Sequence, residues 1–578
     1  MTALGKRKDT YYALICFFVC FIPRIIINLG IKASTGGHDD LGFLAVPSYL
    51  AGYDWSGVIK HTSYYGFGFS ALFMTPIIKI FGGTPFLMFQ IMWATVAAFQ
   101  SLVAVAVYYI AYDLFEYKDR NFCAISGIIM SYLTFCSSCR LENDSVMPLF
   151  IWGIILILSL LIKSDEHRME KTICLDLVVI FLQFMHTRSV IIWIALSIVV
   201  IIYRIMEKRW PVCPKTYLAG MVIGTYLVKK TVSYVQTVVW GTTDLANSSA
   251  GLKNQLLSGA ESGSAIEYIR SFVFLCAGEL FTIIQFSNIL FAVGLVSILF
   301  FLFDKIKRDD RKSEFYSLIF LLILFMGMLG ASGLYWNEDA RNAMASGEFS
   351  KGFFYLRYIS TFAMPIAFWG IALTRDINMK YMALLSFFYI VLCLFVISNI
   401  GALPNQDLWA TFASKYKGNF KSMLTQNDLS IVSIVSLSVF FFFWLLCRKP
   451  GKIKALSMIF LLVATFYNYT YQIQNGAKMW GESVYNSVDG LRTLNTAFLD
   501  DFNIYCNDDI QKYALQLSYP RIAVKDYEDY NGEKKSVLIS RDTDGIKKTD
   551  LYYVICDDEV IYFSDAETKK SVLERINK

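Results

Sequence analysis

The chain has 578 residues, of which 56% are hydrophobic and 16% aromatic, and its formal net charge is +6. Uncharged apolar runs such as 150–162 and 382–397 extend with their flanks to roughly the 20 residues that cross a bilayer. A water-soluble protein has no means of burying so many of them. The modest charge lies in short loops, which excludes a basic face for nucleic acid.

The first apolar stretch follows Lys6-Arg7-Lys8 and runs to about Leu29 without a small-residue cleavage site, so we expect a retained span. The alternating pattern of a membrane barrel is missing, which predicts an all-α polytopic membrane protein. We place about thirteen transmembrane helices at 11–30, 86–112, 121–137, 146–162, 173–186, 189–205, 217–239, 284–303, 315–333, 355–373, 380–399, 430–447 and 455–471.

Basic residues concentrate in alternate connecting segments, on the same side as the N-terminus. The positive-inside rule makes that side cytoplasmic and predicts a multi-pass protein of the cell membrane. The long segments 31–85, 240–283, 334–354 and 400–429 then lie outside, together with the tail. Pro76 and Lys79 interrupt the apolar stretch 66–80, so we expect it to form an interfacial helix, with a second interfacial piece around 266–284.

The tail changes character at about residue 472, where the apolar runs end. Segments 535–540 and 551–555 have the pattern of strands, and 508–517 and 565–576 that of helices. We therefore predict two domains: a transmembrane domain over 1–471, which includes the first outer loop 31–85, and an extracytoplasmic α/β domain over 472–578. Cys506 and Cys556 lie in this tail and could bridge in an oxidising compartment.

Charged residues gather on the predicted outer face, beside a chain that is otherwise apolar. Asp39 and Asp40 follow the first span, Glu142 follows the third, Arg188 follows the fifth and Arg357 begins the tenth. Each has a structural explanation as well. Asp40 could cap a helix beginning near residue 41, Glu142 could pair with Arg140 or Arg188, and Arg357 could extend toward the membrane surface.

The residues after the first span carry a resemblance to a known superfamily. Residues 39–43 (Asp-Asp-Leu-Gly-Phe) precede two aromatic stretches, 49–55 and 64–68. This pattern resembles the GT-C superfamily of membrane glycosyltransferases, in particular the protein O-mannosyltransferases and the lipid A aminoarabinose transferases. In those enzymes an acidic motif and an interfacial helix follow the first span. The second acid is commonly Glu where this chain has Asp40. Glu142 before an apolar helix and residues 354–358 extend the resemblance.

The resemblance implies an inverting transfer of a sugar from a polyprenyl-phosphate donor to an acceptor on the outer face, either a cell-envelope polymer, a lipid or a protein. A carboxylate must take the proton of the acceptor hydroxyl, and we assign this to Asp39, with Asp40 and Glu142 completing the catalytic set. The leaving phosphate needs positive charge. The expected phosphate ligands are Arg357, Lys79, His61 and Arg188, and the expected sugar or acceptor contacts are Tyr64, Tyr65 and Tyr355.

No cofactor is required by the sequence, although a divalent metal ion bound by Asp39, Asp40 and Glu142 stays open. The alternative function is a transporter or flippase of lipid-linked sugars, which would place ionisable residues near the bilayer midplane and show paired repeats. A structural or sensory envelope protein is a third option. Neither the sugar nor the acceptor has a local sequence code.

Overall fold

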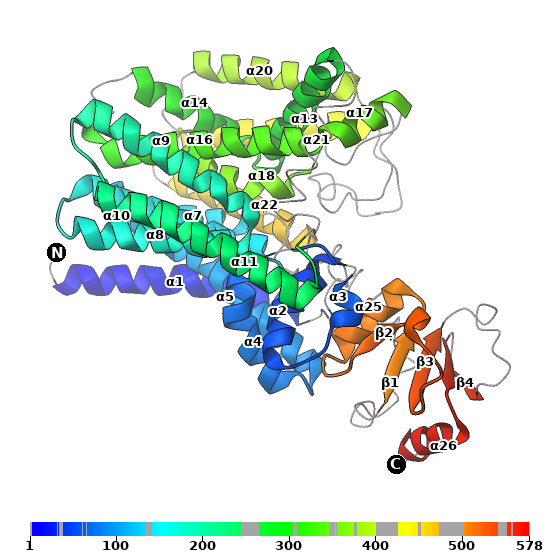
Figure 1. Cartoon of the computed structure of the whole chain (residues 1–578). Coiled ribbons are helices and arrows are strands. Elements are labelled where there is room, and N and C mark those ends of the chain that lie inside the picture. Colours follow the sequence, from blue (N-terminus) through cyan, green and yellow to red (C-terminus); the bar gives the residue numbers. More distant parts are fainter. Residues whose placement is uncertain are drawn as a thin grey trace.

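The computed structural model describes residues 3–29, 31, 33, 38–60, 62–64, 66–133, 141–243, 265–303, 309–346, 353, 355–374, 379–399, 426–448, 452–472, 502–540, 552–556 and 559–576. It consists of a large helical body, in which many long helices lie roughly side by side, and a small α/β domain at the C-terminal end (Figure 1).

The first half of the helical body contains the N-terminal helix and the helices of the first outer loop. Its helices are α1 (Ala3–Asn28), α2 (His38–Ala51), α3 (Ser56–Ile59), α4 (Gly68–Phe81), α5 (Pro85–Tyr109), α6 (Arg120–Tyr132), α7 (Met147–Lys163), α8 (Arg168–Met185), α9 (Val190–Glu207), α10 (Pro214–Ala219) and α11 (Thr225–Trp240). Short π and 3-10 segments join or extend them: η1 (Ile110–Leu114), η3 (Asn143–Ser145), η4 (Thr187–Ser189) and η5 (Gly220–Gly224).

The second half of the body continues the bundle and contains one interrupted helix. Its helices are α13 (Ala265–Phe286), α14 (Leu290–Phe303), α16 (Lys312–Tyr335), α17 (Asn337–Ser346), α18 (Arg357–Ala363), α19 (Ala367–Leu373), α20 (Met379–Ser398), α21 (Gln426–Cys447) and α22 (Lys452–Gln472). The 3-10 turn η7 (Met364–Ile366) separates α18 from α19 at Pro365, because proline cannot continue the hydrogen-bond ladder of an α-helix.

Seven described helices are long and apolar enough to cross a membrane. Six of them, α1, α5, α9, α16, α20 and α21, coincide with predicted spans. The seventh, α13, covers the piece expected around 266–284; with 22 residues it is long enough to span, and its placement along the interface stays a prediction. The other predicted spans coincide with described helices that are shorter, interrupted or more polar, such as α14 with 14 residues.

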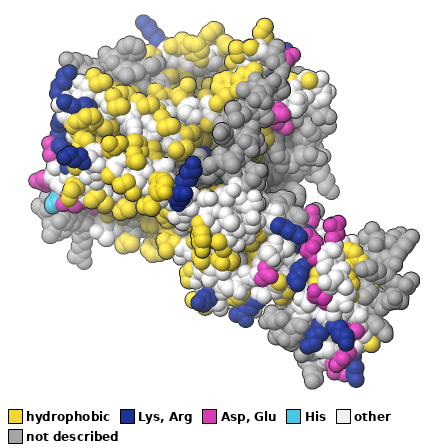
Figure 2. Space-filling model, viewed as in Figure 1, with side chains coloured by type: hydrophobic (Ala, Val, Ile, Leu, Met, Phe, Trp, Pro, Cys, Tyr) yellow, Lys and Arg dark blue, Asp and Glu magenta, His cyan; other side chains and the backbone are white. Residues whose placement is uncertain are grey.

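The surface of the helical body is rich in exposed apolar side chains, as Figure 2 shows for one face. On α20, for example, Phe387, Phe388 and Leu394 are exposed. Exposed apolar surface on this scale is untenable in water and natural in hydrocarbon. The body is therefore built as a membrane-embedded bundle, and its interior is one continuous hydrophobic core.

The C-terminal domain is a five-stranded mixed sheet with the strand order β2-β1-β3-β5-β4. The parallel strands β1 (Asn503–Cys506), β2 (Val524–Asp526) and β3 (Ser536–Ser540) adjoin an antiparallel pair, β4 (Tyr552–Cys556) and β5 (Glu559–Phe563). The helices are α25 (Asp509–Ser518) and α26 (Ala566–Ile576).

These elements confirm the two strands and two helices that the sequence predicted in the tail, with ends shifted by no more than one residue. Strands β1, β2 and β5 were not predicted, since β1 and β2 have only four and three residues. The boundary at residue 472 stays a prediction, because 473–501 lie outside the described residues. Cys506 is buried, and the side chain of Cys556 lies outside the described residues, so the bridge between them stays a prediction.

Candidate active site

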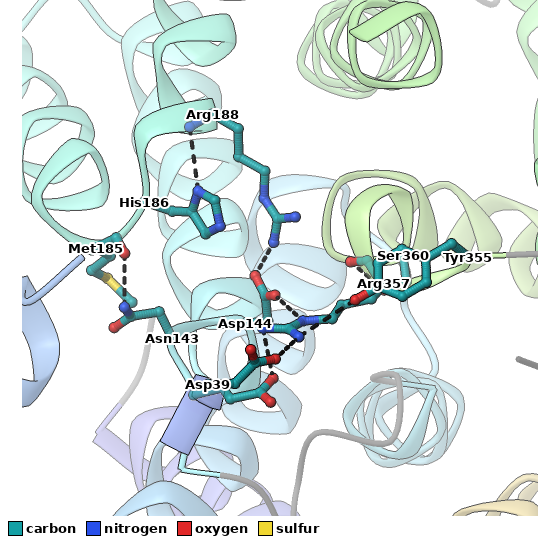
Figure 3. A network of polar contacts seen from close by, with 10 residues as sticks. Asp39, Asn143, Asp144, Met185, His186, Arg188, Tyr355, Arg357 and Ser360 are labelled. Atoms are coloured by element: carbon teal, nitrogen blue, oxygen red, sulfur yellow. Dashed lines mark hydrogen bonds and ion pairs between the residues drawn. The ribbon is translucent and has the colours of Figure 1, made fainter. Parts of the chain in front are cut away.

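Four segments that are distant in sequence bring charged side chains together at one place (Figure 3). Asp39 lies in the first turn of α2, and Glu142 and Asp144 lie in the loop that contains η3. Arg188 belongs to η4, directly after α8, and Arg357 is the first residue of α18. The site thus combines three carboxylates with two guanidinium groups.

Arg357 is the centre of this cluster, because each of its three guanidinium nitrogens engages a different carboxylate. Its Nη1 donates to Asp39, its Nη2 lies 3.2 Å from Glu142 Oε2, and its Nε donates to Asp144 Oδ2 at 3.0 Å. The guanidinium also reaches the hydroxyl of Tyr355, 3.5 Å from Nη1. Arg357 is buried, so these contacts are made away from bulk water.

Backbone contacts to the end of α8 hold two of the converging loops in place. The side-chain amide of Asn143 donates to the carbonyl of Met185 at 2.7 Å, which fixes the loop that carries Glu142 and Asp144. The first outer loop is fixed beside it, where the N–H of Phe67 donates to the carbonyl of Phe184 at 2.9 Å. Gly66 has a φ of +78° there, and a Cβ would overlap the Met185 carbonyl, so this approach requires glycine.

Arg188 is the second cation of the site, and part of its hydrogen-bonding capacity is unused. Its Nη2 donates to Asp144, and its guanidinium stacks over Tyr358 at 5.0 Å from the ring centroid. Its Nε and Nη1 are buried and have no hydrogen-bond partner among the described residues. Buried unpaired donors are costly, and an anionic ligand is the kind of group that would satisfy them.

The ionisation states of Asp144 and His186 follow from their neighbours. Burial alone would raise the pKa of Asp144, but the charges of Arg188 and Arg357 outweigh it and hold the pKa below its usual value. Burial, followed by the charge of Arg188, lowers the pKa of His186 to about 3. His186 is therefore neutral at pH 7, which agrees with its Nδ1 accepting the backbone N–H of Arg188 at 3.3 Å.

Exposure distinguishes the three carboxylates on Arg357. The side chain of Asp39 is 18% exposed, whereas those of Glu142 and Asp144 are 3% and 5% exposed. A substrate hydroxyl can therefore reach Asp39 more readily than either of the other two. Glu142 and Asp144 contact the other two nitrogens of Arg357 and so fix the orientation of its guanidinium.

An aromatic cluster borders the charged group. Tyr355 lies against Trp336 and Tyr358 with ring centroids 5.4 and 4.8 Å away, and Trp336 stacks on Tyr358. Tyr335 completes the cluster at 5.7 Å from Tyr358. Tyr355, Tyr358 and Trp336 are half-buried, so ring edges and faces stay accessible next to Arg357.

The remaining predicted site residues have different places. Asp40 is fully buried in the first turn of α2, which begins at His38 and not near residue 41, so Asp40 lies within the helix and does not cap it. Tyr64 is 2% exposed and packs against Trp240, which leaves little of its ring for a sugar. Lys79 is exposed in the last turn of α4, outside the cluster around Arg357. His61 and Tyr65 lie outside the described residues.

Two features of the site differ from the sequence interpretation. Glu142 pairs with Arg357, whereas Arg140 lies outside the described residues, and Arg357 itself contacts carboxylates. Asp144 was not selected as a site residue, yet it joins both arginines. The available signal was its position two residues after Glu142 in the same polar loop. No group of three or more His, Cys, Asp or Glu among the described residues is arranged to hold a metal ion.

No protein family model and no curated protein matches the sequence. Comparison with solved structures finds ArnT from Cupriavidus metallidurans bound to undecaprenyl phosphate, with 12% identity and a TM-score of 0.53 over 98% of this chain and 99% of that one. The apo state of the same protein gives 10% identity and a TM-score of 0.52, covering 98% of each chain. An oligosaccharyltransferase from Archaeoglobus fulgidus has 12% identity and a TM-score of 0.44, over 92% of this chain and 65% of that one. The chain therefore shares the fold of the ArnT structures over nearly its whole length.

Proposed function

We propose that the protein is an inverting glycosyltransferase that moves a sugar from a polyprenyl-phosphate donor to a hydroxyl group of an acceptor outside the membrane. The observation that carries this proposal is the accessible carboxylate of Asp39, held by a buried arginine. The shared fold with a protein whose structure contains undecaprenyl phosphate supports a lipid-phosphate donor.

Asp39 acts as the general base in this reaction. One of its oxygens binds Arg357, and the carboxylate takes the proton of the acceptor hydroxyl as the hydroxyl oxygen attacks the anomeric carbon. The new glycosidic bond forms on the face opposite the breaking bond between the anomeric carbon and the phosphate oxygen. The electron pair of that bond leaves with polyprenyl phosphate, and the anomeric configuration inverts.

Arg188 is the better candidate for the phosphate than Arg357. All three nitrogens of Arg357 already engage carboxylates, whereas Nε and Nη1 of Arg188 are free among the described residues. A guanidinium with two free N–H directions can hold a phosphate through charge-assisted hydrogen bonds as negative charge grows on the leaving group. The prediction that Arg357 binds the phosphate is thus replaced by a role in fixing Asp39, Glu142 and Asp144.

The test is release of undecaprenyl phosphate when the purified protein is incubated with undecaprenyl-phosphate sugars and a hydroxyl acceptor. A transporter or flippase would move these lipids without cleaving them. Asp39→Asn should lower kcat by about 10²- to 10⁴-fold, the usual contribution of a general base, while binding of undecaprenyl phosphate stays within about twofold.

The matched control is Asp119→Asn. Asp119 is the exposed N-cap of α6, and asparagine caps helices equally well, so this variant should behave as wild type. Wild-type turnover by purified Asp39→Asn would eliminate Asp39 as the base. Absence of any lipid-phosphate release by the wild-type protein, over a panel of sugars and acceptors, would contradict the enzymatic function itself.

A further inference from the structure

The C-terminal domain contacts the chain on both sides of helix α2, which carries Asp39. Before α2, Ala33 is buried in the hydrophobic core of the C-terminal domain, together with side chains such as Val524 and Ile539. After α2, the buried indole of Trp55 donates from Nε1 to the carbonyl of Pro520 at 2.8 Å. The two contacts are 22 residues apart in sequence and enclose the whole of α2.

Helix α3 extends the second contact. Lys60, directly after α3, forms ion pairs with Asp526 at the end of β2 and with Asp529, the latter at 3.3 Å. Gly57 lies so close to β2 that a Cβ on this residue would overlap the carbonyl oxygen of Val524. Figure 1 shows α3 between the helical body and α25. This close approach of two backbones is possible only because residue 57 has no side chain.

The domain is also anchored in the helical body itself. Tyr513 and Leu517 of α25 belong to the hydrophobic core of the body rather than to the core of their own domain. Most of α2 is buried as well, and it packs against α4. The position of α2 is therefore set by the helical body and the C-terminal domain at once, and a shift of the domain would be transmitted to the first turn of α2.

We propose that the C-terminal domain positions the catalytic helix, with Trp55 and Gly57 as positioning residues that act through α2 on Asp39. This inference rests on the proposed function, because it assigns the domain a part in the same transfer reaction. Catalytic groups must be held within a fraction of an ångström of the productive geometry, and a displacement of about 1 Å lowers turnover by about 10²-fold. The C-terminal domain contacts the chain before and after α2, and these two contacts restrict the movement of Asp39.

The test is the substitution Gly57→Ala, which inserts one methyl group between α3 and β2. We expect kcat to fall at least about tenfold while the KM for the donor changes less than about twofold, because α2 moves and the phosphate contact at Arg188 does not. Hydrogen exchange of the α2 amides should accelerate at least about tenfold, since the helix loses an external support. Gly153→Ala in α7 is the matched control, because its Cβ meets only open space.

The two measurements separate this inference from the proposed function. If the wild-type protein releases no polyprenyl phosphate, the proposed function fails, and the exchange of α2 still tests the mechanical coupling. Unchanged α2 exchange in Gly57→Ala, or a kcat equal to that of Gly153→Ala, would overturn the positioning role. A rise in KM without a fall in kcat would also overturn it.

A second variant covers the case in which Gly57→Ala does not fold. Trp55→Phe keeps an aromatic ring but removes the hydrogen bond to Pro520, and it should change kcat and α2 exchange in the same directions. Trp210→Phe is its control, because Trp210 is exposed and makes no hydrogen bond to the C-terminal domain within the described part of the chain. Wild-type values of both quantities in Trp55→Phe would refute the proposal.

Discussion

Replacement of Arg357 by lysine tests the central feature of the site, a single guanidinium shared by three carboxylates. Lysine keeps the positive charge but offers one nitrogen where arginine offers three in a fixed plane. We therefore expect the lysine to keep about one of the three contacts with carboxylates. At about 1.5–3 kcal/mol for each hydrogen bond between charged groups, loss of the other two weakens the cluster by about 3–6 kcal/mol. Removing one partner of a buried ion pair costs a similar 3–5 kcal/mol.

Two consequences are measurable in purified Arg357→Lys. The midpoint temperature of thermal unfolding should fall clearly, because two of the three carboxylates lose their contact with residue 357. kcat should fall by about 10²-fold, because Asp39 is no longer fixed against the substrate. Arg209→Lys provides the control. Arg209 contacts Asp165 at 2.7 Å on the surface, and such an exposed pair contributes no more than about 1 kcal/mol. If Arg357→Lys keeps the midpoint and turnover of Arg209→Lys, the reasoning about Arg357 is wrong.

Two further predictions concern the segment after α8. Arg188→Gln should weaken binding of undecaprenyl phosphate at least about tenfold, measured by titration of the purified protein, and unchanged affinity would remove Arg188 from the phosphate site. His186→Asn should reduce the loss of unfolding free energy that the wild-type protein shows as the pH falls below about 6.5. As pH falls from about 6.5 to about 3, unfolded His186 takes up a proton and folded His186 does not, so the folded state loses stability over this range. Asparagine keeps an acceptor for Arg188 N–H without titrating, and an unchanged profile in thermal melts would refute this assignment.

Local sequence patterns predict the class of the protein and several members of its charged cluster. The apolar runs are long enough to cross a bilayer and lack the alternation of a membrane barrel, so they predict a helical membrane bundle. Both properties are local and need no knowledge of packing. The periodicity of the tail predicted β3, β4, α25 and α26 in the same way. The acid pair after the first span identified Asp39, since a carboxylate beside a membrane span requires a partner or a function.

Which charged side chains meet depends on long-range packing, which no local pattern encodes. Asp39 and Arg357 are 318 residues apart, and no local pattern could show that this arginine contacts three carboxylates. The same holds for Asp144, which looks like an ordinary loop residue until Arg188 and Arg357 approach it from two other helices. The contact of Trp55 with Pro520, 465 residues later, likewise depends on how two bodies pack. Local periodicity determines the elements, whereas long-range packing determines the neighbours of each charge and, through them, its role.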